Sequence, residues 1–259
     1  MDPFAARVML SFLVGGLYAA TLIWISEKYG TKIGGILTGI PTTVLIGLGF
    51  ISLTAGNAAA HKAALIIPAM VGVSLILVYI YTLLMKYGNI RALLGAVAVW
   101  AIFALLFVNL RLHNLAMNIF IGVALFAMTR FAMKSYPSNL KATTKTLRKT
   151  YIARVIGAGT VIASAVVMAR YAGPVWGGVF SAFPATFATT LFMLKRDQGE
   201  DFAKSVARQL PLANGSTMTF AVLFYILVIP AGLFASIAVA MTGSLSYAFL
   251  LLKLSHSKK

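Results

Sequence analysis

The chain has 259 residues, of which 60% are hydrophobic and only 10% are charged, and its formal net charge is +17. Soluble domains carry roughly 25% charged residues, so a chain this apolar is expected to be an integral membrane protein. The absence of cysteine excludes disulfides and thiolate chemistry. The five acidic residues and three histidines are too few and too scattered for an acid–base pair or a metal cluster, so we expect no enzyme, no metal and no cofactor.

Nine apolar segments are each long enough to cross a bilayer, which takes about 20 residues. In chain order they are residues 8–26, 33–53, 63–85, 92–110, 115–133, 151–169, 175–194, 208–229 and 232–252. A short polar linker around Glu27 and Lys28 separates the first two. The expected fold class is therefore an all-α membrane protein with about nine transmembrane helices.

The distribution of basic residues predicts the orientation of these spans. With nine crossings, only Arg7, Lys62, Arg111 and Arg170 fall on the side of the N-terminus, and the other 18 basic residues fall on the opposite side. Basic loops stay in the cytoplasm, so the N-terminus is expected outside and the C-terminus inside a multi-pass plasma or inner membrane protein. The basic segment 134–149 is interpreted as a topology determinant that touches anionic lipid, with a regulatory or partner-binding role as the alternative. This interpretation of the charge leaves no role for nucleic acid.

An internal duplication relates the two halves of the chain. After a shift of 143 residues, 33–85 aligns with 176–228 without a gap and 11 of 53 positions are identical, two prolines and four glycines among them. The two copies enter the membrane from opposite faces in the predicted topology. The sequence thus predicts a 4+1+4 inverted repeat, with four spans in 1–110, a linker span and basic loop in 111–149, and four inverted spans in 150–259. Inverted repeats of this kind recur in transporters and in some channels.

Each copy places a proline near the middle of a span. Pro41 follows Thr38 and precedes Thr42 and Thr43, and in the second copy Pro184 follows Ser181 and precedes Thr186. Proline removes a hydrogen bond to the carbonyl four residues earlier, so the carbonyls of Leu37 and Phe180 are expected to be freed. Such groups in a membrane must face protein, water or a solute. The alternative is a pair of simple proline kinks that serve helix packing.

The eighth span adds a polar face to this expected crossing. Asn214 and Thr217 are three residues apart and share one side of a helix. They either line a solute pathway or form hydrogen bonds between helices. The expected substrate-binding residues are Thr38, Pro41, Thr42, Thr43, Ser181, Pro184, Thr186, Asn214 and Thr217.

The second motif, together with Gly199, the basic start of the eighth span at Arg208 and the region of Tyr225, resembles the GlpM-like small inner-membrane proteins. Those proteins look like single four-span units, so the resemblance implies that this chain is a fused, inverted pair. The chain departs from their pattern at Ser181, where a further proline is expected. The resemblance implies that the proteins are related, but it implies no activity and no site residues.

Together these features predict a transporter or facilitator for a small neutral or anionic solute. Lys204 and Arg208 stand at the predicted inner mouth, where they could attract an anion. No acidic residue lies inside a span, which disfavours coupling to protons or sodium through a buried carboxylate. The alternatives are a passive channel with the same pore and a non-transporting membrane scaffold. A homodimer is compatible with the sequence.

Overall fold

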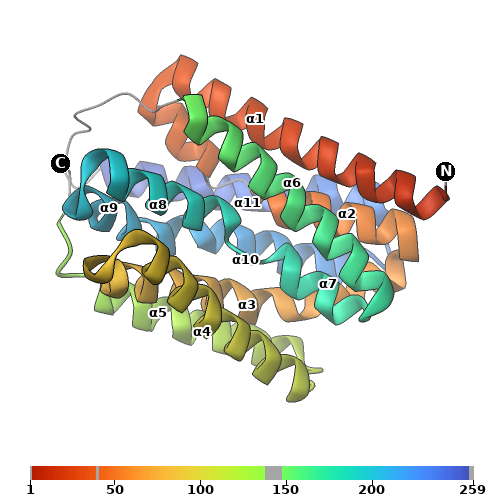
Figure 1. Ribbon diagram of the computed structural model, residues 1–259. Helices are drawn as coiled ribbons and strands as arrows, with labels where there is room; N and C mark the ends of the chain where they lie inside the picture. The colour runs from red at the N-terminus through yellow and green to blue at the C-terminus, as the bar shows by residue number, and fades with distance from the viewer. Residues whose placement is uncertain (1, 39–40, 138–147, 257–259) are drawn as a thin grey trace.

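The computed structural model of the chain describes residues 2–38, 41–137 and 148–256, and within them it is helical without any strand. The helices are α1 (Pro3–Thr38), α2 (Thr42–Ala55), α3 (Asn57–Leu84), α4 (Asn89–Asn109), α5 (Leu115–Ala132), α6 (Arg148–Tyr171), α7 (Pro174–Ser181), α8 (Ala185–Gln198), α9 (Glu200–Ala207), α10 (Leu210–Leu227) and α11 (Gly232–His256), with the short 3-10 turn η1 (Met85–Tyr87) after α3. Most of the predicted basic loop, residues 138–147, lies outside the described residues. Figure 1 shows the helices running roughly side by side along one direction.

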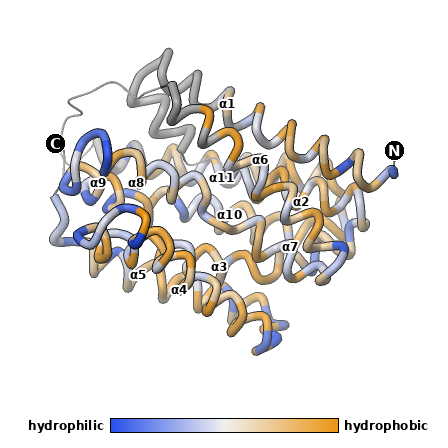
Figure 2. Tube along the Cα trace, in the orientation of Figure 1, coloured by the Kyte–Doolittle hydropathy of each residue, from blue (hydrophilic) through white to orange (hydrophobic). Residues whose placement is uncertain are grey.

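Six stretches of the described chain are long and apolar enough to cross a membrane: Asn57–Tyr87, Asn89–Asn109, Leu115–Ala132, Pro174–Gln198, Glu200–Leu227 and Gly232–Leu251. Three shorter apolar helices, Pro3–Tyr18, Thr42–Ala55 and Val155–Tyr171, accompany them. An all-helical chain with several such helices has the construction of a multi-pass membrane protein. Figure 2 shows hydrophilic residues gathered at the ends of the helices and hydrophobic residues along their middles.

The start of the chain departs from the predicted spans. The residues around Glu27 and Lys28, where the sequence predicts a polar linker, are helical and belong to α1, which ends at Thr38. No proline interrupts residues 27–32, and a single glycine is tolerated inside a helix. The guanidinium of Arg7 donates to the carbonyl of Leu53 at 3.1 Å, so α2 returns to the end of the molecule where α1 begins. A straight helix from Arg7 to Thr38 would be about 46 Å long, whereas Thr42 and Leu53 are only about 17 Å apart along α2. The chain therefore already reverses direction within α1.

Helix α3 forms the centre of the bundle. In its most apolar 18-residue window 83% of the residues are buried, against 17% in α5, which lies at the edge of the bundle. The carbonyl group of Pro68 on α3 packs directly on the backbone of Gly122 on α5, where a side chain would not fit. Close approach at such small residues is the usual way in which membrane helices gain packing contacts.

The two ends of the bundle differ in charge. Arg7 and Arg170 lie at one end, where the Arg170 guanidinium is over the Phe4 ring at 4.3 Å and Arg7 reaches α2. At the other end Arg130 donates to the carbonyl of Arg208 at 3.3 Å, and Lys195 donates to the carbonyl of Met85. Figure 1 places the turns after α4, α6 and α10 at the first end, and the turns after α3 and α8 at the second.

Candidate functional site

Two short helices with matching boundaries follow the two motif prolines. Pro41 directly precedes α2 with φ −77° and ψ 62°, and Pro184 directly precedes α8 with φ −84° and ψ 51°. Each helix has 14 residues. Each ends at a glycine with positive φ, Gly56 at φ 87° and Gly199 at φ 91°, a conformation that glycine adopts without a steric penalty.

The motif prolines sit at chain breaks and not at kinks within continuous helices. Helix α7 ends at Ser181, residues 182–184 are non-helical, and α8 begins at Ala185. In the first half α1 ends at Thr38 and α2 begins at Thr42. Figure 1 shows the extended link between α7 and α8 near the middle of the bundle. Non-helical backbone at this depth requires hydrogen-bond partners from the surrounding protein or from a bound molecule.

At the second break, the carbonyl that binds a donor from another helix is that of Ala182. The prediction that Pro184 frees the carbonyl of Phe180 is wrong. The Phe180 carbonyl accepts from the Phe183 amide at 3.1 Å, because the chain closes a tight turn before the proline. The Ala182 carbonyl accepts from the hydroxyl of Ser74 on α3 at 2.7 Å. Nothing in the sequence marks Ser74 as the partner of this break. The Leu37 carbonyl expected in the first half adjoins residues 39–40, which lie outside the described residues.

Ser181 faces α2 from the last turn of α7. The side chain is fully buried, and its hydroxyl oxygen has no hydrogen-bond partner within the described chain. Gly47 lies directly against it, since a Cβ atom at Gly47 would overlap the Ser181 hydroxyl. One helical turn away, a Cβ at Gly177 would lie 2.9 Å from Cδ1 of Ile51. Residue numbers rise on α2 as they fall on α7, so these two helices are antiparallel.

This antiparallel contact sets the relative level of the two breaks. Thr42 begins α2 five residues before Gly47, which corresponds to about 7.5 Å along the helix axis. The residues of the second break follow Ser181 in the same direction. The two proline breaks therefore lie at similar depth near the middle of the bundle.

Aromatic side chains close the α7–α8 break on the side of α4. The buried Trp100 ring stands edge-on to Phe183 at 4.8 Å between centroids and to Phe180 at 6.2 Å. Its indole nitrogen has no partner within the described chain. Sequence analysis missed Trp100, because nothing in the chain marks which helix covers the break.

The glycine pair before the second break allows α7 to pack tightly between two helices. A Cβ at Gly178 would overlap the carbonyl of Ala63 on α3. On the other side, a Cβ at Gly177 would lie 3.1 Å from the carbonyl oxygen of Ala165 on α6. The broken helix is thus held backbone to backbone against its neighbours, which fixes the position of Ser181.

Asn214 reaches similar depth from α10. His61 on α3 stacks on Tyr225 of α10 at 3.9 Å between ring centroids, and Tyr136 binds both Thr82 near the end of α3 and Arg208 just before α10, so the two helices are antiparallel. Asn214 lies 11 residues before Tyr225, and Ser74 lies 13 residues after His61. Measured from the stacked pair, the depths of Asn214 and Ser74 along the helix axes therefore differ by about 3 Å. The Asn214 amide nitrogen is buried without a partner in the described chain. Three buried polar atoms without a partner in the described chain, on Ser181, Asn214 and Trp100, therefore occur at the level of the breaks.

The other expected site residues are placed less centrally. Pro41 and Pro184 are buried, Thr42, Thr43 and Thr217 are half-buried, and Thr186 is exposed. The hydroxyls of Thr189 and Thr190, beside Thr186, donate to carbonyls of their own helix. Thr38 is the last residue of α1, and its side chain lies outside the described part of the chain.

Charged groups stand away from the breaks and are engaged at the basic end of the bundle. Lys204 pairs with Glu200 at 2.7 Å, and the Arg208 guanidinium donates to the Tyr136 carbonyl at 2.7 Å. The Tyr136 hydroxyl shares a hydrogen bond with Thr82, and burial raises the pKa of this phenol above its usual value. Lys204 and Arg208 thus hold this end together, and their contacts do not direct them toward the breaks. No group of His, Asp or Glu within the described residues could hold a metal ion.

Comparisons with known proteins supply no relative. No protein-family model matches the chain, and no curated protein or solved structure matches it significantly.

Proposed function

We propose that the chain is a nine-span membrane transporter or facilitator whose solute site lies where the two broken helices meet. The six long apolar stretches and three shorter apolar helices supply the nine crossings. In this proposal α2 completes a span begun at the end of α1, and α7 with α8 forms a second broken span.

The matched boundaries of α2 and α8 support an inverted duplication. Helix α2 runs from its break toward the end where Arg7 binds the Leu53 carbonyl. Helix α8 runs from its break toward the opposite end, where Lys195 binds the Met85 carbonyl. Two copies of one motif that leave the middle of the bundle in opposite directions are typical of inverted transporter repeats. Kinship with GlpM-like proteins would fit the same duplication.

The observation that carries the proposal is the unpaired Ser181 hydroxyl beside the α7–α8 break. A buried hydroxyl without a partner is unfavourable by about 1–3 kcal/mol. An alanine would fill the same space without that penalty, so stability alone does not account for the serine. A solute that bound the hydroxyl would satisfy it. The unpaired amide of Asn214 at the same level adds a second polar group.

The polar groups of the breaks favour a neutral solute over an anion. Ser181, Ser74 and Asn214 are uncharged, and Arg208 is hydrogen-bonded at the basic end of the bundle. An anion in the middle of a membrane needs a compensating cation, whereas hydroxyl and amide groups suffice for a neutral molecule.

Burial at the crossing favours a gated transporter over an open channel. The side chains of Ser181 and Ser74 are 0% and 2% exposed. An open pore would leave these groups in contact with water. We therefore interpret this conformation as closed around the site, with one of the two helix ends opening during transport.

The distribution of basic residues supports the proposed orientation. The end that carries Lys195 and Arg208 would face the cytoplasm, and the end with Arg7 and Arg170 would face outside, in a plasma or inner membrane. Anionic lipid would contact the basic cytoplasmic side.

A binding screen tests the proposed site. The melting temperature of the purified protein is measured with neutral solutes (urea, glycerol, acetamide, butanediol) and with anions (acetate, nitrate). A ligand at 100 times its Kd stabilises the native state by about 2.7 kcal/mol. We expect a neutral solute to raise the melting temperature of the wild type. Ser181→Ala should be at least as stable without ligand and should lose the shift, and a shift that persists in Ser181→Ala would place the site elsewhere.

A further inference from the structure

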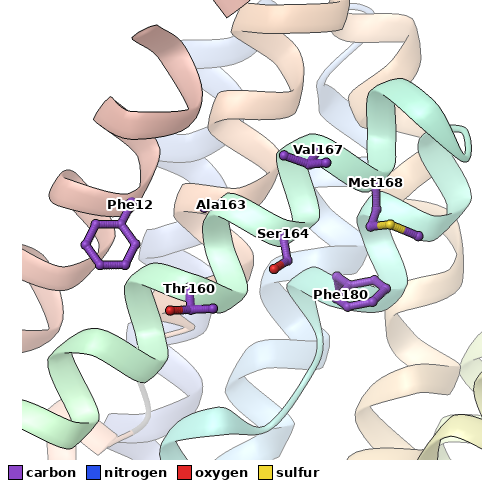
Figure 3. Close-up of a pocket in the computed structure, with 7 residues that line it drawn as sticks. All are labelled: Phe12, Thr160, Ala163, Ser164, Val167, Met168 and Phe180. Atoms are coloured by element: carbon purple, nitrogen blue, oxygen red, sulfur yellow. The ribbon is translucent and has the colours of Figure 1, made fainter. Parts of the chain in front are cut away.

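A groove of about 470 Å3 opens between α1, α6 and α7, beside the second break (Figure 3). It is lined by Phe12, Thr160, Ala163, Ser164, Val167, Met168 and Phe180. Its walls are mainly hydrocarbon, and the hydroxyls of Thr160 and Ser164 come from one face of α6, four residues apart. A mostly apolar site of this size with a few polar groups is typical of small-molecule pockets.

The two hydroxyls of the groove are free to bind a ligand. Serine and threonine in a helix commonly donate to the carbonyl three or four residues earlier. Thr54, Thr129 and Thr219 do so. The hydroxyls of Thr160 and Ser164 make no hydrogen bond to any described residue. The groove therefore presents two hydroxyls that its own helix does not occupy.

The depth of these hydroxyls restricts what could bind them. In the apolar part of α6, Val155–Tyr171, Ser164 is nine residues from the start and seven from the end, or about 14 Å and about 11 Å along the axis. Ser164 thus lies near the middle of the hydrocarbon layer, and Thr160 lies one helical turn closer to the Val155 end. A resident phospholipid presents only methylene groups at that depth. A molecule that pairs with Thr160 and Ser164 must carry an uncharged polar group able to enter the hydrocarbon.

The groove adjoins the proposed solute site. Phe180 lines it and immediately precedes Ser181 on α7. The opposite side of α7 is closed by the contact of Gly178 with Ala63. The groove therefore meets the last turn of α7 at Phe180, while Gly177 and Gly178 in the preceding turn pack on α6 and α3.

We propose that this groove binds an uncharged amphipathic molecule that partitions into the bilayer, with its hydrocarbon part on Phe12, Val167 and Phe180 and its polar group on Thr160 and Ser164. This inference rests on the proposed function and names the substrate class of the same site. The solute approaches Ser181 sideways from the lipid and not along the bundle axis.

A second groove of the same chain provides a matched control. It measures about 370 Å3 and lies between α10 and α11, lined by Leu223, Ala238, Val239, Thr242, Gly243 and Ser246. Thr242 there already donates to the Ala238 carbonyl at 2.9 Å, so this groove offers a single hydroxyl, that of Ser246, where the first groove offers two. General partitioning of an apolar probe would label both grooves, whereas a specific site would label only the first.

The test uses a photoactivatable octanol that carries a diazirine ring, with the full-length protein in lipid nanodiscs. After illumination, labelled peptides are located by mass spectrometry. We expect saturable labelling between residues 155 and 183 that excess 1-octanol removes. The double variant Thr160→Val with Ser164→Ala should bind about ten-fold more weakly. Ala163→Trp should abolish labelling by filling the groove, and Thr242→Val should leave it unchanged.

The outcomes separate this inference from the proposed function. Equal labelling of both grooves, failure to saturate, or wild-type labelling in Thr160→Val with Ser164→Ala would overturn the groove site. Specific labelling without any solute transport by the reconstituted protein would retain the groove as a binding site and reject the transport function. Transport that Ala163→Trp leaves intact would reject the groove as the route to Ser181.

Discussion

The hydroxyl of Ser74 on α3 donates a hydrogen bond of 2.7 Å to the carbonyl oxygen of Ala182, 108 residues later in the chain. The same hydroxyl also contacts the carbonyl of Met70 in its own helix at 2.9 Å. A helix of the first half thus completes the hydrogen bonding of a break in the second half. The two halves are coupled at the depth where the solute site is proposed.

Removal of this hydroxyl should destabilise the fold. Ser74→Ala leaves the buried Ala182 carbonyl without a donor, and we expect a loss of about 1–3 kcal/mol in the free energy of unfolding. Ser11→Ala is a matched control, because Ser11 is equally buried and donates only to Val8 of its own helix. Ser74→Thr should retain most of the stability. Equal losses for Ser74→Ala and Ser11→Ala in chemical unfolding would refute a special role for the contact with Ala182.

The contact of α7 with α3 requires glycine at position 178. Gly178→Ala would drive a methyl group into the Ala63 carbonyl, and we expect destabilisation by about 1–3 kcal/mol. Gly49→Ala is the control, since its Cβ would lie 3.9 Å from Ile237 in ordinary contact. That variant should be neutral or up to about 1 kcal/mol more stable, because alanine favours the helix. Thermal unfolding of the two proteins in the same detergent measures the difference.

The contact between α2 and α7 can be tested with a double-mutant cycle at Gly47 and Ser181. Gly47→Ala places a methyl group on the Ser181 hydroxyl, so this variant alone should lower the melting temperature. Ser181→Gly removes the obstructing atoms. The double variant should therefore be more stable than the sum of the single effects predicts, as expected for residues in direct contact. Additive effects would mean that Gly47 and Ser181 do not touch.

Single cysteines can test the proposed orientation, because the chain has no native cysteine. His113→Cys lies in the turn between α4 and α5, and Lys86→Cys lies in η1 at the opposite end of the bundle. A membrane-impermeant maleimide added to intact cells should label the first and spare the second. Both should react after permeabilisation. The reverse pattern in intact cells would invert the proposed topology.

Much of the local backbone could be predicted from the sequence. Proline inside an apolar segment and glycine at a turn act within a few residues, which is why the breaks at Pro41 and Pro184 and the turns at Gly56 and Gly199 occur where their residue types indicate. The same local reasoning predicted a polar linker around Glu27 and Lys28, where the backbone is helical. Charged residues at Glu27 and Lys28 mark a change of environment, but they do not break a helix.

The partners of the breaks could not be predicted, because they come from distant parts of the chain. Ser74, Trp100 and Gly47 meet the second break across more than 80 residues, and their own neighbourhoods carry no sign of it. The tight turn after Phe180 likewise depends on packing around α7, which moved the externally bonded carbonyl to Ala182. Residue types identified the positions of the breaks, and only the tertiary contacts identify the groups that pack against them and form their hydrogen bonds.

Solute flux through reconstituted protein tests the central claim most directly. Proteoliposomes are shrunk in hyperosmotic urea, glycerol, acetamide or butanediol, and their reswelling is followed by stopped-flow light scattering. We predict that the wild type accelerates reswelling at least five-fold over protein-free vesicles for one or more of these neutral solutes. Ser181→Leu and Pro184→Leu, purified as folded proteins, should return the rate to that of protein-free vesicles. Wild-type reswelling no faster than that of protein-free vesicles with every solute, or full flux in both variants, would contradict a solute site at the two broken helices.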